Sequence, residues 1–136
     1  MEHVTLQDLP GHAPSRLRWG VDAGVLVVEF HGQRHSPAHM AGCWHAVKRL
    51  AEAQGLVRVL AIDRMDDEPL TGEQRRDFIA HLGQEFLQGR RWAYVARSID
   101  RVGAYEATQL DALELGIEVR VFASRAEADL WVRFPG

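Results

Sequence analysis

The segment that decides the fold reads Val57-Arg58-Val59-Leu60-Ala61-Ile62-Asp63. It is short and rich in β-branched and aliphatic residues, with Gly55 before it and a charged loop after it. A run of this kind is typical of a strand buried on both faces, as in the middle of a parallel sheet. We therefore interpret the other segments as strands and crossover helices arranged around a central strand over residues 57–63.

The size and charge of the chain limit the classes of protein to which it can belong. Its 136 residues fit one domain, and 46% hydrophobic residues exclude the disordered class. The net charge is -3, and sixteen basic and nineteen acidic side chains are mixed along the chain. No basic tail or stripe stands out in the sequence, which argues against a nucleic-acid binder or a protein of anionic membrane surfaces.

Cysteine usage and the N-terminal sequence indicate the compartment. Cys43 is the only cysteine, so no intrachain disulfide can form, and a reducing compartment is the simple interpretation. The N-terminal residues have neither the basic start nor the apolar block of a signal peptide. The apolar runs are far shorter than the ~18 residues that a membrane span needs. We expect a cytoplasmic protein without stable membrane insertion.

The first part of the chain predicts an arm, a hairpin and a helix. Residues 1–14 contain two prolines and are interpreted as an extended arm, and residues 17–21 and 25–31 as two antiparallel strands. Ser36 is a candidate N-cap followed by a proline at the first helical position, and Gly55 a candidate C-cap. Three apolar residues are expected to hold the arm: Val4, Leu6 and Leu9.

The second helix is predicted from its capping residues. Thr71 and Gln74 have the spacing of a capping box, and the helix is expected to stop near Gly89. Its expected inward residues are Phe78, Ile79, Leu82 and Phe86.

Two strands and two helices are predicted in the remainder. The strands cover residues 92–96 and 117–122, the second with an alternation that suggests an edge strand. A third helix spans roughly residues 100–115, and Ser124 opens a short last helix. The inward residues expected on the third helix are Val102, Leu110 and Leu113.

The order of elements is β-β-α-β-α-β-α-β-α. The later connections each exceed the ~12 residues that a parallel crossover needs, and such crossovers are almost always right-handed. The prediction is an α/β fold over residues 1–136, with a single mixed, mostly parallel sheet covered by helices.

Two segments near the C-terminus resemble a known family. Gly116–Phe122 is a strand ending in Val-Phe, and Glu127–Val132 is a Glu-Ala-x-x-Trp-aliphatic helix; both follow the strand Arg91–Ala96. This pattern resembles the STAS-like family, small bacterial proteins with the fold of anti-sigma-factor antagonists, also likened to the CRAL-TRIO fold. The shared motif consists of packing positions, Ala128 and Trp131. The resemblance implies a binding or regulatory module rather than an enzyme.

The resemblance also points to Thr71. Anti-sigma-factor antagonists carry a phosphorylatable Ser or Thr at the start of the helix after the central strand, within an Asp-Ser-Ser/Thr-Gly-like motif. Here the segment Glu68-Pro69-Leu70-Thr71-Gly72 keeps only the last pair. Thr71 is thus a candidate phosphoacceptor by resemblance and an ordinary N-cap by the statistics of helix termini.

A ligand site is expected beyond the carboxyl ends of the parallel strands. That edge would collect His31, Asp63, Arg97 and Ser98. The N-termini of helices nearby favour anions, and an arginine adds charge for a phosphate or a carboxylate. A small anionic ligand is one interpretation; the other is the ordinary polar loop edge of any such fold.

Two clusters raise the question of a metal. Asp63, Asp66 and Asp67 offer the oxygen ligands that Mg²⁺ prefers, but a solvated acidic loop explains them as well. His31, His35, His39 and Cys43 are spaced by four residues, yet a helix that begins after Ser36 aligns only the last two. We therefore predict no metal and no cofactor.

Three hypotheses for the function follow. The first is a non-catalytic STAS-like binding or regulatory module, homodimeric, that acts through protein partners or a small apolar or anionic ligand. The second is a small enzyme whose strand-end site uses His31, Asp63 and Arg97. The third is a phosphoacceptor switch at Thr71.

Overall fold

The computed structural model describes residues 4–83, 90–114 and 118–134 and contains one six-stranded mixed sheet. Its strands lie side by side in chain order; β1 and β2 run antiparallel to their neighbours, and β3 to β6 are parallel. An α/β fold with a mostly parallel sheet is thus confirmed. The strands are β1 (Gln7–Leu9), β2 (Ser15–Asp22), β3 (Val25–Gly32), β4 (Arg58–Met65), β5 (Arg91–Val95) and β6 (Glu118–Phe122).

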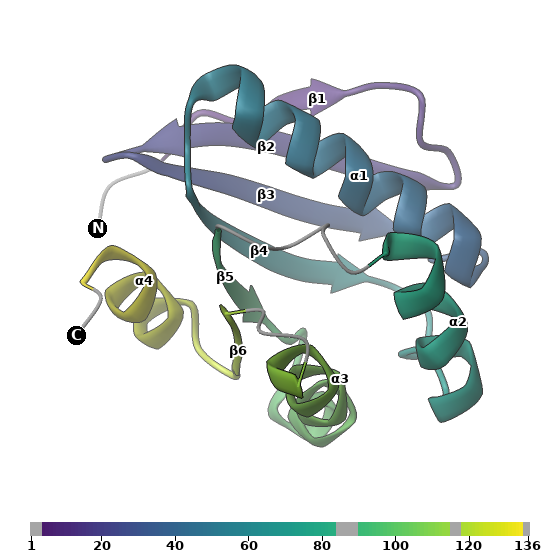
Figure 1. Ribbon diagram of the computed structural model, residues 1–136. Coiled ribbons are helices and arrows are strands. Elements are labelled where there is room, and N and C mark those ends of the chain that lie inside the picture. The colour runs from purple at the N-terminus through teal and green to yellow at the C-terminus, as the bar shows by residue number, and fades with distance from the viewer. Residues whose placement is uncertain (1–3, 84–89, 115–117, 135–136) are drawn as a thin grey trace.

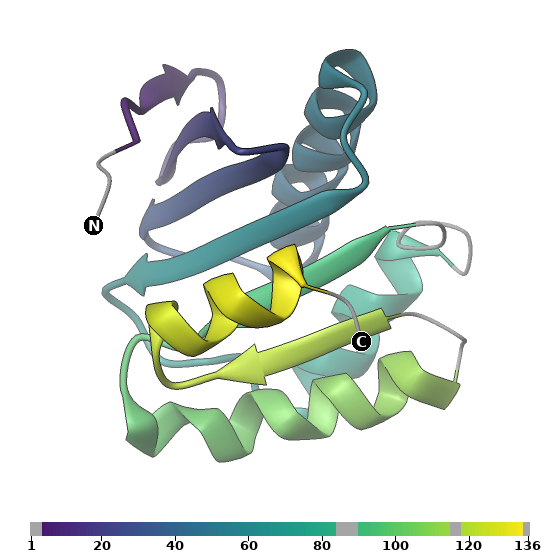
Figure 2. The same cartoon turned by 90° about the vertical axis from the view of Figure 1, so that its left-hand side faces the viewer.

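Helices lie on both faces of this sheet (Figures 1 and 2). Helices α1 and α2 lie on one face, α4 lies on the other, and α3 runs along the β6 edge. We refer to the two faces as the α1 face and the α4 face. The helices are α1 (Pro37–Gln54), α2 (Gly72–Leu82), α3 (Val102–Glu114) and α4 (Arg125–Arg133), with a short 3-10 turn at Ile99–Arg101.

Strand β4 is buried from both sides, as its apolar run predicts. Val59 and Ala61 face the α1 side and pack in the cluster that contains Val47 of α1. Leu60 and Ile62 face the α4 side and pack with α4 residues. The strand therefore divides the core into two apolar layers.

The N-terminal arm contains a strand that the sequence did not reveal. Three residues, Gln7–Leu9, pair antiparallel with β2 and place Leu9 opposite Leu17. The segment is short and ends at Pro10, so neither its length nor its composition indicates a strand. Val4 and Leu6 pack on the α4-side core, so all three residues expected to hold the arm do so.

The predicted helix termini near Ser36 and Thr71 are confirmed. Ser36 accepts a hydrogen bond from the backbone N–H of His39 at 3.1 Å, and α1 ends at Gly55 with φ 68°. Thr71 and Gln74 form both bonds of the capping box, at 2.9 and 3.3 Å.

Helix α2 is less buried than its pattern suggests. Phe78 and Leu82 pack against the α1-side core but stay partly exposed, and no described residue of α2 is fully buried. The helix ends at Gly83, and the expected positions Phe86 and Gly89 lie outside the described residues.

The inward orientation predicted for two leucines of α3 is wrong. Leu110 is 61% and Leu113 is 67% exposed. The reason is the position of α3, which lies beside the edge strand β6 and not over a face of the sheet. From there the Gln109 side chain accepts a hydrogen bond from the backbone N–H of Val121 at 2.8 Å. The edge position predicted for β6 is confirmed.

Gly20 of β2 offers a test of how the arm is held. A Cβ atom at this position would lie 2.6 Å from the Thr5 carbonyl oxygen and 2.7 Å from Val4 Cγ1. Because this close approach involves backbone, we expect Gly20→Ala to lower the free energy of unfolding by about 1–3 kcal/mol. Hydrogen exchange of residues 5–9 should accelerate at the same time.

The matched control is Gly42→Ala on α1. A Cβ atom there meets no atom within 4 Å, so alanine should stabilise the exposed helix position by about 0.5–1 kcal/mol. Equal unfolding free energies for the two variants in urea denaturation would contradict the proposed packing of the arm.

Candidate functional site

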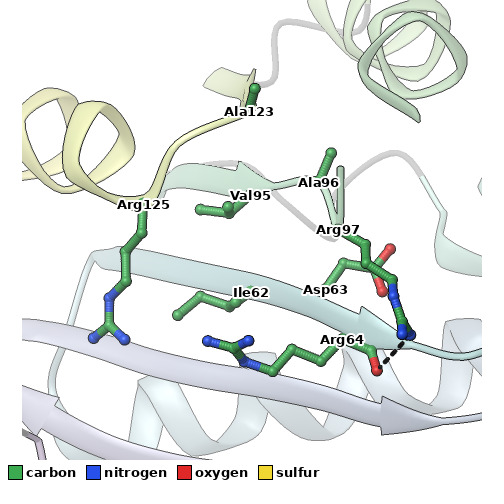
Figure 3. Close-up of a pocket in the computed structure, with 8 residues that line it drawn as sticks. All are labelled: Ile62, Asp63, Arg64, Val95, Ala96, Arg97, Ala123 and Arg125. Carbon is green, nitrogen blue, oxygen red and sulfur yellow. Dashed lines mark hydrogen bonds between the residues drawn. The ribbon is translucent and has the colours of Figure 1, made fainter. Parts of the chain in front are cut away.

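A depression of about 470 Å³ lies on the α4 face, at the carboxyl ends of β4 and β5 and the start of α4 (Figure 3). Its size falls within the range of small-molecule sites. It is lined by Ile62, Asp63, Arg64, Val95, Ala96, Arg97, Ala123 and Arg125.

Two arginines face an apolar floor in this depression. Figure 3 shows that the side chains of Arg64 and Arg125 extend toward the same part of the sheet surface, next to Ile62. Arg64 Nε lies 3.5 Å from a carboxylate oxygen of Glu29. Among the residues that the structure describes, none bonds to the guanidinium of Arg125, although this side chain is partly buried. The depression therefore carries positive charge, and the N–H donors of the Arg125 guanidinium have no partner among the described residues.

The first turn of α4 adds to this charge. Ser124 is the N-cap, and its hydroxyl accepts a hydrogen bond from the backbone N–H of Glu127 at 3.4 Å. Arg125 is consequently the first residue of a nine-residue helix. The positive end of the helix dipole lies at the rim of the depression, where it favours an anion.

Arg97, predicted to bind a ligand, lines the depression but uses its donors within the protein. Its guanidinium donates to the carbonyl oxygens of Arg64, at 3.3 Å, and Met65 (Figure 3). It also lies 3.2 Å from a carboxylate oxygen of Asp66. Arg97 thus fixes the end of β4. It contributes positive electrostatic potential to the depression more than hydrogen bonds to a ligand.

Asp63 lines the depression, but its carboxylate is fully buried toward the α1 side. One oxygen accepts from the Arg34 guanidinium at 2.5 Å and from the Tyr94 hydroxyl at 2.8 Å. The other accepts from the backbone N–H of Met65 at 2.8 Å. Arg34 also binds Asp67 at 2.7 Å, so we interpret Asp63 as the centre of a structural network.

His31 and Ser98 complete the set of predicted site residues. His31 lies beside Arg64 in the register of β3 and β4, and its Nε2 lies 2.9 Å from Glu29 Oε1. Ser98 is not among the lining residues; its carbonyl accepts from the backbone N–H of Arg101 at 3.1 Å. The structure thus brings Asp63 and Arg97 to the depression and His31 next to it, with Ser98 apart.

Sequence reasoning missed Arg64 and Arg125. Arg64 could have been found from the alternation of side chains along β4, because it lies on the same face of the strand as Leu60 and Ile62. Arg125 could have been found from its position directly after the N-cap Ser124, at the strand-end edge of the sheet.

The clusters considered for metals are held by other contacts. Asp66 and Asp67 each pair with an arginine, which places a guanidinium where a cation would bind. His39 lies 3.1 Å from Ser15 Oγ and 3.7 Å from Cys43 Sγ. Within residues 4–83, 90–114 and 118–134, no group of three His, Cys, Asp or Glu side chains is arranged to hold a metal ion.

Burial also determines the state of Cys43. Desolvation raises the pKa of its thiol, and this outweighs the hydrogen bond with Ser15 that acts in the other direction. The neutral thiol dominates near neutral pH, which agrees with a packing role and not with a nucleophile.

Comparisons with known proteins place this chain in no family. No protein-family model matches the sequence, and no curated protein is similar to it. In the part of the chain that the structure describes, no helix has the length and apolar character needed to cross a membrane.

The pKa of Glu29 predicts how the His31–Glu29–Arg64 cluster responds to acid. Burial acts to raise this pKa, but the His31 hydrogen bond and the charge of Arg64 together hold it below its ordinary value. The stabilisation is therefore complete above the pKa of the unfolded chain and is lost as pH falls through the lower, folded value. Glu29→Gln should destabilise the protein at pH 7, and the difference should disappear toward pH 2.

Urea denaturation of both proteins across this pH range tests the expectation. Glu52→Gln, which removes an exposed carboxylate of α1, supplies the background change. If the loss of unfolding free energy caused by Glu29→Gln grew toward pH 2, this would contradict the lowered pKa of Glu29.

The buried pair Arg34–Asp63 should dominate the stability of the strand ends. Asp63→Asn removes the buried one of the two carboxylates that bind the Arg34 guanidinium and leaves only the partly exposed Asp67, so it is expected to cost about 3–5 kcal/mol of unfolding free energy. Asp66→Asn disrupts only the exposed pair with Arg97, so its cost should stay below about 1 kcal/mol. Equal losses in chemical denaturation would show that the network is not structural.

Proposed function

We propose that this chain is a non-catalytic, STAS-like binding module that recognises a small organic anion in the depression on the α4 face. The observation that carries the proposal is Arg125, a residue of intermediate exposure whose guanidinium shares an apolar floor with Arg64 and has no partner among the described residues. An anion bound in the depression would accept hydrogen bonds from this guanidinium.

The chemistry of the depression defines the ligand. Guanidinium groups bind carboxylates and phosphates through two parallel hydrogen bonds, which are stronger when water is partly excluded. Ile62 and Val95 supply the apolar part of the floor, so a ligand that carries an apolar portion beside its charge fits better than a bare ion.

Binding is better supported than catalysis. The carboxylate of Asp63 is occupied by Arg34, Tyr94 and a backbone N–H, so it is not placed to take a proton from a ligand. His31 is held by Glu29. The enzyme hypothesis built on His31, Asp63 and Arg97 thus has less support from the geometry.

The regulatory part of the proposal rests on the element order and on the resemblance to STAS-like proteins. In this proposal, occupancy of the depression is sensed by a protein partner or by a second copy of the chain. Thr71 lies at the start of α2 on the opposite face, and both capping bonds engage it. This favours its interpretation as a helix cap over that of a phosphoacceptor.

Titration of ¹⁵N-labelled protein with phenyl phosphate tests the site by NMR. Amide signals of Ala96, Ala123 and Arg125 should shift together, and Arg125→Gln should weaken binding about tenfold or more, because it removes charge-assisted hydrogen bonds.

The control is Arg76→Gln on α2, which makes the same change of charge on the α1 face. Its affinity should equal that of the wild type. The proposal is wrong if no signals around the depression move, or if both variants weaken binding equally.

A further inference from the structure

A row of basic side chains continues from the depression across the sheet. On the α4 face, Arg64 lies beside His31 of β3, and His31 lies beside Arg16 of β2. Neighbouring strands are about 4.8 Å apart, so the backbone positions of Arg64 and Arg16 are separated by roughly 10 Å. The strand order makes this row contiguous with the depression.

The part of this face around the depression and the row carries more arginines than carboxylates. Five arginines lie there: Arg16, Arg18, Arg64, Arg97 and Arg125. Three carboxylates are paired with them: Asp8, Glu29 and Asp66. The excess is local, since the whole chain has a net charge of -3. This arrangement was not visible in the sequence because the five arginines come from four separate segments.

The row is open to solvent. In Figure 2, α4 lies over the part of the sheet formed by β4, β5 and β6, and the part formed by β2 and β3 has no helix in front of it. The side chain of Arg16 is 63% exposed and that of Arg64 is 51% exposed. A ligand in the depression can therefore extend along the row without displacing any helix.

We propose that the ligand of this site contains a chain of linked phosphoryl groups, as in an oligophosphate or its organic ester. One end lies between Arg64 and Arg125, and the chain passes His31 toward Arg16. This inference rests on the proposed function and specifies its ligand. A single phosphate or carboxylate reaches only the depression, whereas linked phosphoryl groups repeat negative charge along the line that joins Arg64 to Arg16.

An acidic peptide fits the row less well. The row crosses β2, β3 and β4, each of which is hydrogen-bonded to a strand on both sides. At the centre of the row, His31 is paired with Arg16 of β2 and with Arg64 of β4, so β3 offers no free sheet edge of the kind at which a peptide main chain usually binds. Recognition there depends on side-chain charge alone, and this favours an anion whose charges are closely spaced.

Calorimetric titrations with orthophosphate, pyrophosphate and tripolyphosphate at constant ionic strength test the inference. Tripolyphosphate should bind about tenfold or more tightly than orthophosphate, because it reaches additional cationic groups. Arg16→Gln should remove this gain and leave the affinity for orthophosphate unchanged. Arg125→Gln should weaken binding of both anions, and Arg76→Gln of neither.

The outcomes separate this inference from the proposed function. If orthophosphate and tripolyphosphate bind equally well and Arg125→Gln weakens both, the depression binds anions but the row is not used, and this inference fails alone. If neither anion nor phenyl phosphate binds, the proposed function fails as well. A tetraglutamate peptide that binds as tightly as tripolyphosphate would also overturn the choice of a phosphoryl chain. Circular dichroism confirms that each variant is folded.

Discussion

The alternation of side chains along β4 is the constraint on which the rest of the structure depends. Apolar residues on both faces let one strand support two core layers, with α1 on one side and α4 on the other. At the end of the strand the same alternation separates two neighbours with opposite roles. Asp63 turns inward to the α1 side and pairs with Arg34, while Arg64 turns to the α4 side and borders the depression. A shift of one residue in register would exchange these positions.

Two arginines fix the backbone at the carboxyl end of β4. Arg34 connects the end of β4 to the following loop by binding both Asp63 and Asp67, and Arg97 holds the carbonyl of Met65. Backbone groups beyond the last pairs of a sheet otherwise rely on water. These contacts hold the loop that follows β4 at the edge of the depression, so the binding proposed above would require little ordering of that loop.

Much of the fold could be predicted from the sequence, and less of the site. The run at residues 57–63 and the caps at Ser36 and Thr71 are local signals, and each is confirmed. Strand β1 is too short to leave such a signal. The candidate site depends on which distant segments meet, so Asp63 and Arg97 were found from strand ends, whereas Arg125 required knowledge of which strands α4 packs against. The burial of Asp63 could not be predicted, because Arg34, the residue that pairs with its carboxylate, is far from it in the sequence.

The contact between Gln109 and Val121 has a consequence for how copies of this chain can associate. An edge strand with free backbone donors invites a strand from another molecule, and here a side chain of α3 occupies a donor of β6. At the opposite edge, β1 has three residues and is followed by Pro10, which offers little length for pairing. Both borders of the sheet thus offer limited backbone for pairing with another strand. A continuous sheet across two copies of this chain is consequently disfavoured.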